Sequence, residues 1–314
     1  MVPARTKTDG VLSTARSIED VEKLLADQRY VADRDLAVTI FLALALEKPL
    51  FLEGEAGVGK TEVAKVLAAG LGRRLIRLQC YEGLDVSHAL YEWNYAKQIL
   101  HIRLAESRAK ADDGASVERE IFSPSFLIKR PLLQALEIPE AGEPAVLLID
   151  EIDRADEEFE AFLLEILSDF QVTVPEIGTF SAKQRPIVVL TSNRTREVHD
   201  ALKRRCLYYW IDYPNVEREA SIVTSKVPGI EARLAHEASA YVAALRSEPF
   251  FKVPGIAETI DWAAALVALG KTSLDERTVA ETIGCVLKYQ EDVRRARDTN
   301  ATGRLEQSRR AARA

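Results

Sequence analysis

The chain has 314 residues, of which 47% are hydrophobic and 29% charged, and its formal net charge is −7. This composition is that of a folded globular protein, so disordered, collagen-like and disulfide-stapled chains are excluded. The longest uncharged apolar run, which contains residues 37–46, is too short to cross a bilayer, which takes roughly 20 residues. The N-terminus lacks the apolar stretch of a signal peptide, so we expect a cytoplasmic protein without a transmembrane segment, with peripheral contact at the cytoplasmic membrane face left open.

The charge balance and the metal-binding residue types exclude further classes of function. An acidic chain is a poor nucleic-acid partner, because neutralising phosphates requires concentrated positive charge. Cys80, Cys206 and Cys285 lie far apart and match no zinc or redox spacing, which predicts buried free thiols. The four histidines form no metal-binding pair, so we expect no transition-metal site.

The predicted elements divide the chain into a sheet region and a helical region. Two helices are predicted first, over 17–29 and 33–47. Five apolar runs then alternate with helical patterns and predict a parallel sheet covered on both faces: 50–54, 74–80, 145–150, 186–191 and 206–212. After the Tyr213-Pro214 break, only helices are predicted, over about 216–226, 231–247, 257–269 and 275–290. The expected organisation is a flexible N-terminus at 1–16, an α/β core at 17–213, a helical domain at 214–290 and a polar, largely frayed tail at 291–314.

A phosphate-binding loop is predicted at the end of the first strand. The sequence there is a complete G-x-x-x-x-G-K-T motif, Gly54-Glu55-Ala56-Gly57-Val58-Gly59-Lys60-Thr61, and an amphipathic helix follows it. Backbone N–H groups of such a loop surround phosphate oxygens, Lys60 reaches the β- and γ-phosphates, and the Thr61 hydroxyl ligates Mg²⁺. A simple glycine-rich turn would not require the Lys60-Thr61 pair. ATP and Mg²⁺ are therefore the predicted cofactors.

Two carboxylates follow the apolar strand at 145–150. Asp150 and Glu151 need an explanation at the edge of a core, because uncompensated buried charge is costly. A P-loop site supplies one, in which Asp150 holds Mg²⁺ through water and Glu151 acts as general base on the attacking water. The alternative is a surface-facing acidic turn over residues 151–154. A helicase box is excluded, because two tandem motor domains do not fit in this length.

The motifs occur in an order that resembles a known family. GEAGVGKT, VLLIDEID, TSN and LKRRC precede the helical region, and in this the chain resembles an AAA+ ATPase of the MoxR family. The stretches LQCYEGLDVSHALYEWNYAKQ, FLIKRPLLQAL and VPGIAETIDW are similar to the branch of that family that contains CoxD, associated with maturation of molybdenum-copper carbon monoxide dehydrogenase. The resemblance covers roughly residues 20–290. It implies a five-stranded, three-layer αβα core followed by a helical lid.

The resemblance also implies roles for further residues. Asn193 would position water against the γ-phosphate, and Arg205, with Arg204 as the neighbouring choice, would be the arginine finger that reaches the next subunit's nucleotide. Inserts at about 84–126 and 170–185 would resemble the helix-2 insert and the pre-sensor-1 hairpin, which face the ring opening in related proteins. Aromatic residues in or beside the first insert are left open between core and contact roles: Tyr81, Tyr91, Trp93 and Tyr95. Residues 256–260 contain no arginine, so no lid sensor is assigned.

The function implied by the resemblance is that of a chaperone-like ATPase. It would assemble as a homo-oligomer, a hexameric ring, and work with a von Willebrand factor A domain protein to insert a metal cofactor into a metalloenzyme client. Three alternatives remain. A P-loop kinase or GTPase shares the first motif, although the chain has no NKxD guanine signature. A DNA-directed AAA+ motor is disfavoured by the net charge. A nucleotide-gated interaction module with little hydrolysis is the third.

Overall fold

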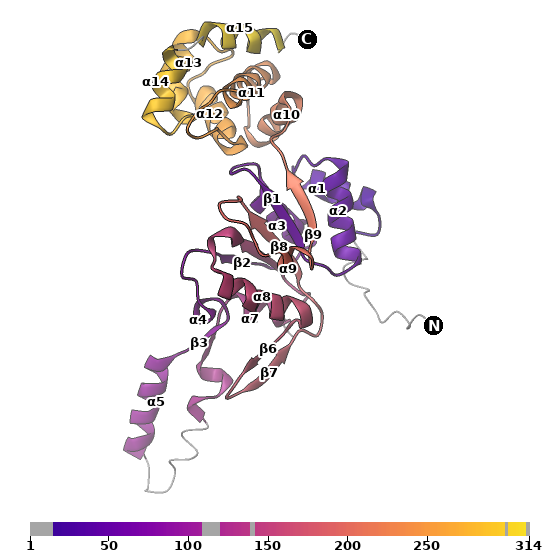
Figure 1. Ribbon diagram of the computed structural model, residues 1–314, viewed down its shortest axis with the longest axis vertical. Helices are drawn as coiled ribbons and strands as arrows, with labels where there is room; N and C mark the ends of the chain where they lie inside the picture. Colours follow the sequence, from indigo (N-terminus) through magenta and orange to yellow (C-terminus); the bar gives the residue numbers. More distant parts are fainter. Residues whose placement is uncertain (1–14, 109–119, 139–141, 299–300, 312–314) are drawn as a thin grey trace. The chain divides into compact units, whose positions relative to one another are not determined.

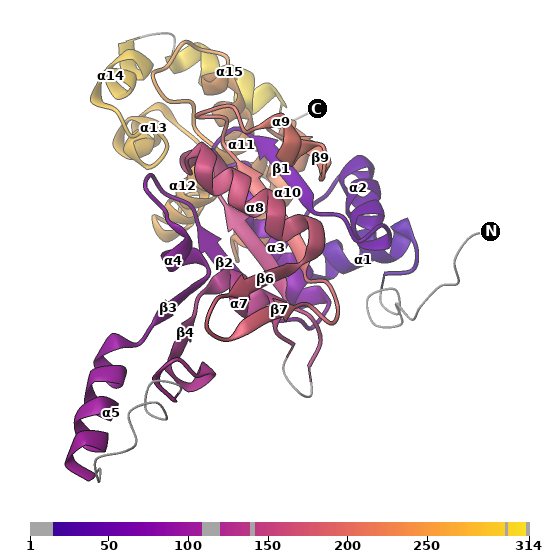
Figure 2. The same ribbon diagram turned by 60° about the horizontal axis from the view of Figure 1, so that its bottom comes forward.

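A computed structural model of the protein describes residues 15–108, 120–138, 142–298 and 301–311 (Figures 1 and 2). The chain folds into two compact units. The sheet unit comprises the described residues of Met1–Val21, Asp35–Leu52 and Ala64–Tyr209. The helical unit comprises Glu22–Arg34, Glu53–Val63 and the described residues of Trp210–Ala314. Each unit has its own hydrophobic core.

A five-stranded sheet forms the framework of the α/β fold, in the strand order β2-β5-β8-β1-β9 (Figure 1). Its strands are β1 (Leu50–Gly54), β2 (Leu75–Gln79), β5 (Val146–Asp150), β8 (Ile187–Ser192) and β9 (Leu207–Ile211). β5 pairs in parallel with β2 on one side and with β8 on the other. Every residue of β1 and of β5 is buried, as in strands covered on both faces. The predicted α/β fold is confirmed, and each strand lies within one residue of its predicted bounds.

Helices precede and connect these strands. They are α1 (Ile18–Asp27), α2 (Arg34–Ala45), α3 (Lys60–Gly70), α4 (Val86–Ala89), α5 (Tyr95–Arg108), α7 (Pro131–Leu136), α8 (Glu157–Asp169) and α9 (Asp200–Lys203). Short 3₁₀ turns form at η1 (Pro124–Phe126) and η2 (Ile152–Arg154). The side chain of Asp156 caps α8 by accepting a hydrogen bond from the backbone N–H of Phe159. Phe159, Leu163 and Ile166 of α8 recur at helical spacing and are buried in the core.

Two small antiparallel ribbons extend the sheet unit. β3 (Tyr91–Trp93) pairs with β4 (Leu127–Lys129), and in both views α5 stands away from the sheet at the end of this ribbon (Figures 1 and 2). β6 (Gln171–Val174) pairs with β7 (Gly178–Ser181) as a hairpin directly after α8. Trp93 is buried in the core, whereas Tyr81 and Tyr95 are 45% and 62% exposed. The aromatic residues of the first ribbon region are therefore divided between core and surface.

The helical unit consists of a bundle around Tyr241 and Trp262. Its helices are α10 (Val216–Lys226), α11 (Ala232–Arg246), α12 (Ile256–Ala268), α13 (Glu276–Thr282), α14 (Gln290–Asp298) and α15 (Ala301–Ala311), with the 3₁₀ turn η3 (Ile283–Cys285) after α13. Each of the first four lies close to a predicted helix. The domain boundaries predicted from the sequence stay a prediction.

The C-terminal tail differs from the sequence prediction. The prediction of a largely frayed segment after residue 290 is wrong for its described part, which forms α14 and α15. Ala296 and Leu305 are buried in the core of the helical unit, and the buried Arg304 forms an ion pair with Glu248. These few apolar side chains fall on the inner side of very polar helices, so their periodicity is too weak to recognise in the sequence. Within the described ranges, no helix is long and apolar enough to cross a membrane.

Candidate functional site

The loop that follows β1 has a backbone only glycine can form. Gly54, Gly57 and Gly59 have φ angles of +155°, +80° and +96°, a region that L side chains rarely adopt. A Cβ on Gly54 would also lie 2.3 Å from the carbonyl oxygen of Ile211, so no side chain fits there. The loop leads into α3, which begins at Lys60. The P-loop motif thus has the strand–loop–helix setting that its chemistry requires.

Lys60 is held by the loop it follows. Its ammonium group donates hydrogen bonds to the backbone carbonyls of Gly54 and Glu55, at 2.9 and 2.6 Å. Only 5% of the residue is exposed. The loop therefore folds around the lysine and directs its carbonyl groups toward that charge. Thr61 follows in the first turn of α3.

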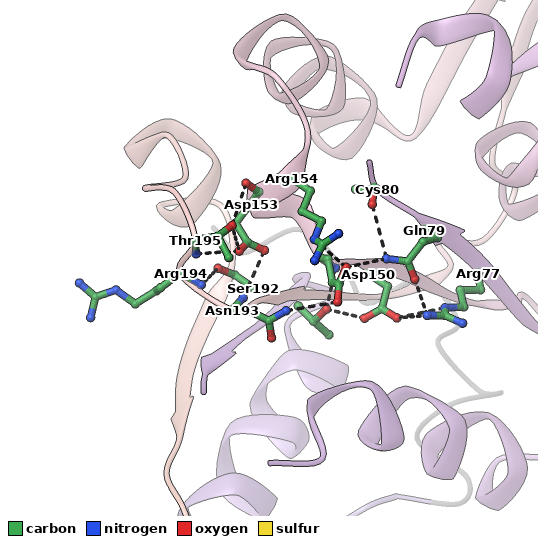
Figure 3. Close-up of polar contacts among 12 residues, drawn as sticks. Arg77, Gln79, Cys80, Asp150, Asp153, Arg154, Ser192, Asn193, Arg194 and Thr195 are labelled. Atoms are coloured by element: carbon green, nitrogen blue, oxygen red, sulfur yellow. Dashed lines mark hydrogen bonds and ion pairs between the residues drawn. The ribbon is translucent and has the colours of Figure 1, made fainter. Parts of the chain in front are cut away.

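Asp150, the last residue of β5, is buried and fully engaged on the sheet unit. Its Oδ1 accepts a hydrogen bond from the Thr191 hydroxyl at 2.6 Å. Its Oδ2 accepts from Nε and Nη2 of Arg77 at 3.0 and 2.6 Å, and Figure 3 shows this ion pair reaching across from β2. The carboxylate is only 3% exposed, whereas the Arg77 side chain is 51% exposed. The negative charge of Asp150 is therefore balanced by a cation that can move into solvent.

Glu151 is the centre of a second group of contacts. Its backbone is left-handed, with φ 56° and ψ 52°, a conformation that is strained for a residue with a side chain. Its Oε1 accepts from Asn193 Nδ2 at 3.3 Å, and its Oε2 from Gln79 Nε2 at 3.1 Å. Arg154 forms an ion pair with the same Oε2 at 3.0 Å. The structure thus brings Asn193 to Glu151, and the role toward the γ-phosphate that the resemblance implies for Asn193 stays a prediction.

A third carboxylate, Asp153, organises the loop after β8. It is 3% exposed and accepts hydrogen bonds from the backbone N–H of Asn193 at 3.2 Å and from the N–H and hydroxyl of Thr195 at 2.9 and 2.7 Å (Figure 3). In the sequence it stands out only as part of an acidic turn. It holds Asn193 in place through the backbone, so Asp153 is a positioning residue for that side chain.

Several residues of this group were missed from the sequence. Arg77 and Gln79 alternate with buried Ile76 and Leu78 along β2, so both polar side chains lie on one face of the strand. Two polar residues on one face of an otherwise apolar strand indicate a polar site beside that strand, and this signal could have identified them. Thr191 links Asp150 and Glu151, because its hydroxyl donates to Asp150 and accepts a hydrogen bond from the Glu151 N–H at 2.9 Å.

The thiol of Cys80 lies beside this group without taking part in it. Its backbone N–H donates to the Asp150 carbonyl oxygen at 2.8 Å. Burial, together with nearby carboxylates such as Asp150, raises the pKa of the Cys80 thiol to about 12. Burial raises the pKa of Cys206 to about 12 as well. Both are free thiols, as predicted, and both stay protonated at neutral pH.

Arg204 and Arg205 lie between α9 and β9, and both are exposed. The backbone N–H of Arg205 closes the turn by donating to the Leu202 carbonyl at 3.1 Å. In the part of the chain that the structure describes, neither arginine contacts Asp150 or Glu151. Their predicted role toward a neighbouring subunit stays a prediction.

A pocket of about 290 Å³ adjoins the P-loop within the helical unit. Its wall is mainly apolar and comes from the segment after α1, the P-loop, the end of β9 and the helices α10 and α12. The apolar residues that line it are Tyr30, Val31, Gly57, Val58, Gly59, Ile211, Pro214, Ile222, Ile256, Ala257 and Ile260. Charged residues also line it: Arg29, Glu62, Asp212, Arg218 and Lys226. No sequence motif marks these positions, so the pocket was not predicted.

An ion pair fixes the N-terminal wall of this pocket. Arg218 on α10 donates to the Val31 carbonyl oxygen at 3.3 and 3.0 Å and pairs with Asp33 at 2.7 Å. Burial raises the pKa of the Tyr30 hydroxyl above its usual value, so it stays protonated. These contacts attach the segment before α2 to α10, and so hold this wall of the pocket in place.

The oxygen donors that each unit offers are of the kind that Mg²⁺ takes together with phosphate. Among the described residues, no group of three or more His, Cys, Asp or Glu side chains could hold a metal ion by itself. Mg²⁺ typically keeps several waters and takes one or two protein oxygens plus substrate phosphates. A buried carboxylate at Asp150 and a hydroxyl at Thr61 are oxygen donors of that kind.

Comparison with known proteins assigns the family. Residues 49–206, half of the chain, match the family described as AAA domain (dynein-related subfamily), and the chain belongs to this family. The match contains the P-loop, Asp150, Glu151, Asn193 and both arginines.

The solved structures to which this chain is similar have low sequence identity to it. A mutant form of RuvB from Thermotoga maritima is 17% identical with a TM-score of 0.46, covering 88% of this chain and 72% of that one. The Thermotoga maritima structure described as the RuvB Holliday junction branch migration motor is 15% identical, TM-score 0.41, covering 88% and 68%. A putative ATPase from Cytophaga hutchinsonii is 14% identical, TM-score 0.48, covering 96% of both chains. No protein of curated function matches the sequence.

Proposed function

We propose that this protein binds ATP with Mg²⁺ and hydrolyses it. The observation that carries the proposal is the hydrogen-bonded group of Asp150, Glu151 and Asn193, with a complete P-loop on another strand of the same sheet. β8 stands between β5 and β1 in the strand order, and ligands of open α/β sheets bind at the carboxyl ends of the strands. That one nucleotide uses both groups is part of this proposal, on the family to which the chain belongs.

Each residue then has a defined task. The P-loop N–H groups and Lys60 bind the phosphates, and Thr61 and Asp150 would hold Mg²⁺, Asp150 through water, which neutralises phosphate charge. Glu151 accepts the proton of the attacking water as general base, and Asn193 orients Glu151 and that water. Glu151 must first leave Gln79 and Arg154, because both donors occupy its Oε2, an oxygen that could accept the proton.

The nucleoside would occupy the pocket beside the P-loop. Its volume of about 290 Å³ and its apolar wall suit a flat base and ribose. Adenine is our assignment, on the family to which the chain belongs. A comparison of ATP with GTP binding tests this assignment and the GTPase alternative together.

The cellular role we propose is that of a MoxR-type chaperone. The motifs and lid sequence resemble the branch associated with carbon monoxide dehydrogenase maturation, which supports metal-cofactor insertion into a molybdenum hydroxylase client. A von Willebrand factor A domain protein would be the partner, and a hexameric ring the working form. Gene neighbourhood tests this role: a von Willebrand domain gene beside molybdenum hydroxylase subunits supports it.

One observation favours a second candidate, a nucleotide-gated interaction module that hydrolyses little. Glu151 is engaged by Gln79, Asn193 and Arg154 together, which would keep it from water if those contacts persist with nucleotide bound. A basal ATPase rate measured on the purified protein separates the two candidates.

The direct test compares Lys60→Ala with Glu151→Gln. Lys60→Ala should abolish tight ATP binding, since the lysine contacts ground-state phosphates, whereas Glu151→Gln should keep binding and stop turnover. Fluorescent-nucleotide binding and phosphate release measure the two effects. Equal loss of binding in both variants would remove Glu151 from the role of general base.

A further inference from the structure

The first turn of α12 contacts the P-loop through its backbone, within the helical unit. The N–H of Ile256 donates a hydrogen bond to the carbonyl oxygen of Gly57 at 3.1 Å. Gly255, the N-cap of α12, donates its own N–H to Glu258 Oε2 at 3.0 Å, which completes the capping of the helix. The hydrogen bond to Gly57 is therefore made by one of the N–H groups that a helix start cannot satisfy internally.

The close approach of the P-loop, and not the backbone conformation of residue 255, requires a glycine at this position. Its φ of −85° and ψ of −176° are extended and open to any residue. A Cβ at this position, however, would lie 2.9 Å from the carbonyl oxygen of Ala56 and 2.9 Å from the Cα of Gly57. Packing at that distance does not occur in folded proteins, so a side chain here would push α12 off the loop.

The contact fixes the orientation of one peptide of the P-loop. In a trans peptide the C=O and the N–H point in opposite directions. Because the Gly57 carbonyl points to Ile256, the N–H of Val58 points away from α12. The phosphates are held by such N–H groups, and Gly57, at φ +80°, could otherwise rotate with little penalty.

We propose that the start of α12 is a backbone latch on the P-loop, defined by Gly255 and Ile256 against Ala56 and Gly57. The latch makes Gly255 a positioning residue for phosphate binding and couples lid position to nucleotide affinity through a peptide plane instead of a charged side chain. The inference rests on the proposed nucleotide binding. Ile256 and Ala257 also line the pocket beside the loop, so the same turn of helix contacts both loop and pocket.

Gly255→Ala tests the packing half of the latch. Affinity for a fluorescent Mg-ATP analogue should fall roughly five- to tenfold, the effect of losing one hydrogen bond and its geometry. Gly284→Ala is the matched control in the same unit, because its Cβ would meet nothing within 4 Å and its φ is not positive. The control should bind like the wild type. Thermal unfolding of both variants establishes that they fold.

Ile256→Pro and Ile256→Ala test the hydrogen bond itself. Proline is tolerated at the first helical position and removes the N–H donor together with the isoleucine side chain, whereas alanine removes that side chain and keeps the donor. Binding should be weaker in the proline variant than in the alanine variant, again by roughly fivefold or more. Amide exchange of the peptide covering residues 54–60 should accelerate in Gly255→Ala and Ile256→Pro alone.

The outcomes separate the latch from the proposed function. If wild type binds ATP and Gly255→Ala binds equally well, or if the proline and alanine variants at 256 are alike, the latch is wrong and nucleotide binding stands. If Gly255→Ala does not fold, the comparison at 256 decides alone. A wild type that binds no nucleotide would overturn the proposed function and the latch with it.

Discussion

Two residues of β2 contact the two carboxylates at the end of β5. Arg77 and Gln79 share a face of the edge strand, and they contact Asp150 and Glu151 respectively. They also contact each other through a hydrogen bond from Arg77 to Gln79. A guanidinium on Asp150 and a Mg²⁺ ion near it would be two cations competing for one carboxylate. Arg77 should therefore set how much Mg²⁺ the site requires.

Arg77→Gln tests this competition. The Mg²⁺ concentration that gives half-maximal binding of a fluorescent ATP analogue should fall roughly two- to fivefold, the range expected for a partly exposed ion pair. Arg74→Gln is the control, since Arg74 donates to the Gln134 carbonyl and to neither carboxylate. A higher Mg²⁺ requirement in Arg77→Gln would mean that Arg77 supports the metal site instead of opposing it.

The sequence alone predicted the local setting of the P-loop, because that prediction does not depend on the order of the strands in the sheet. A P-loop is local, so its setting between a strand and a helix follows from the sequence alone. Arg77 and Thr191 became visible only with the fold, because their partner Asp150 lies on a different strand. Which strands are neighbours depends on packing of the whole sheet, which short patterns do not encode.

At the scale of elements, a buried ion pair joins helices of the helical unit. Glu219 on α10 is fully buried and accepts from Nη1 and Nη2 of Arg246 on α11 at 2.5 and 2.7 Å. Thr259 on α12 donates to Glu219 Oε1 at 2.6 Å, and Arg246 stacks over the Tyr213 ring at 4.6 Å. One carboxylate thus links three helices, including the one whose start contacts the P-loop.

Glu219→Ala should destabilise the helical unit by about 3–5 kcal/mol, because it leaves the Arg246 charge buried without its partner. Chemical denaturation followed by circular dichroism measures the loss. Glu217→Ala, on the exposed side of the same helix, should change stability by no more than about 0.5 kcal/mol. Similar effects of the two variants would show that Arg246 finds another partner or reaches water.

The sequence predicted apolar strands more closely than polar helices, because only burial of apolar side chains leaves a clear pattern in the sequence. Strands buried on both faces give continuous apolar runs, so β1, β5 and β8 were located closely. The helices α14 and α15 are predominantly polar, and their attachment relies on Arg304 and on a few apolar contacts. The pocket beside the P-loop is assembled from four separate segments and therefore has no signature in any one of them.

On the scale of the whole molecule, the exposed arginines Arg204 and Arg205 before β9 contact neither Asp150 nor Glu151 in the described part of the chain, so we place their function at a neighbouring subunit. A cation aimed at the γ-phosphate from a neighbouring subunit stabilises transition-state charge and adds little to ground-state affinity. Such fingers are worth roughly 10³ to 10⁵ in rate in other P-loop systems. We therefore predict that Arg205→Ala retains ATP binding and loses turnover, with Arg204→Ala as the control.

Mixing variants tests whether Arg205 acts on the neighbouring subunit. Arg205→Ala subunits keep their own Glu151, and Glu151→Gln subunits still carry the arginine, so mixed assemblies should recover hydrolysis that neither variant shows alone. Phosphate release at fixed total protein, with light scattering to verify mixed assembly, measures this recovery. A larger defect in Arg204→Ala would move the assignment by one residue. If mixed rings form and stay inactive, or if the wild type turns over at full rate as a dilute monomer, the site is complete within one chain and the shared-site ring is wrong.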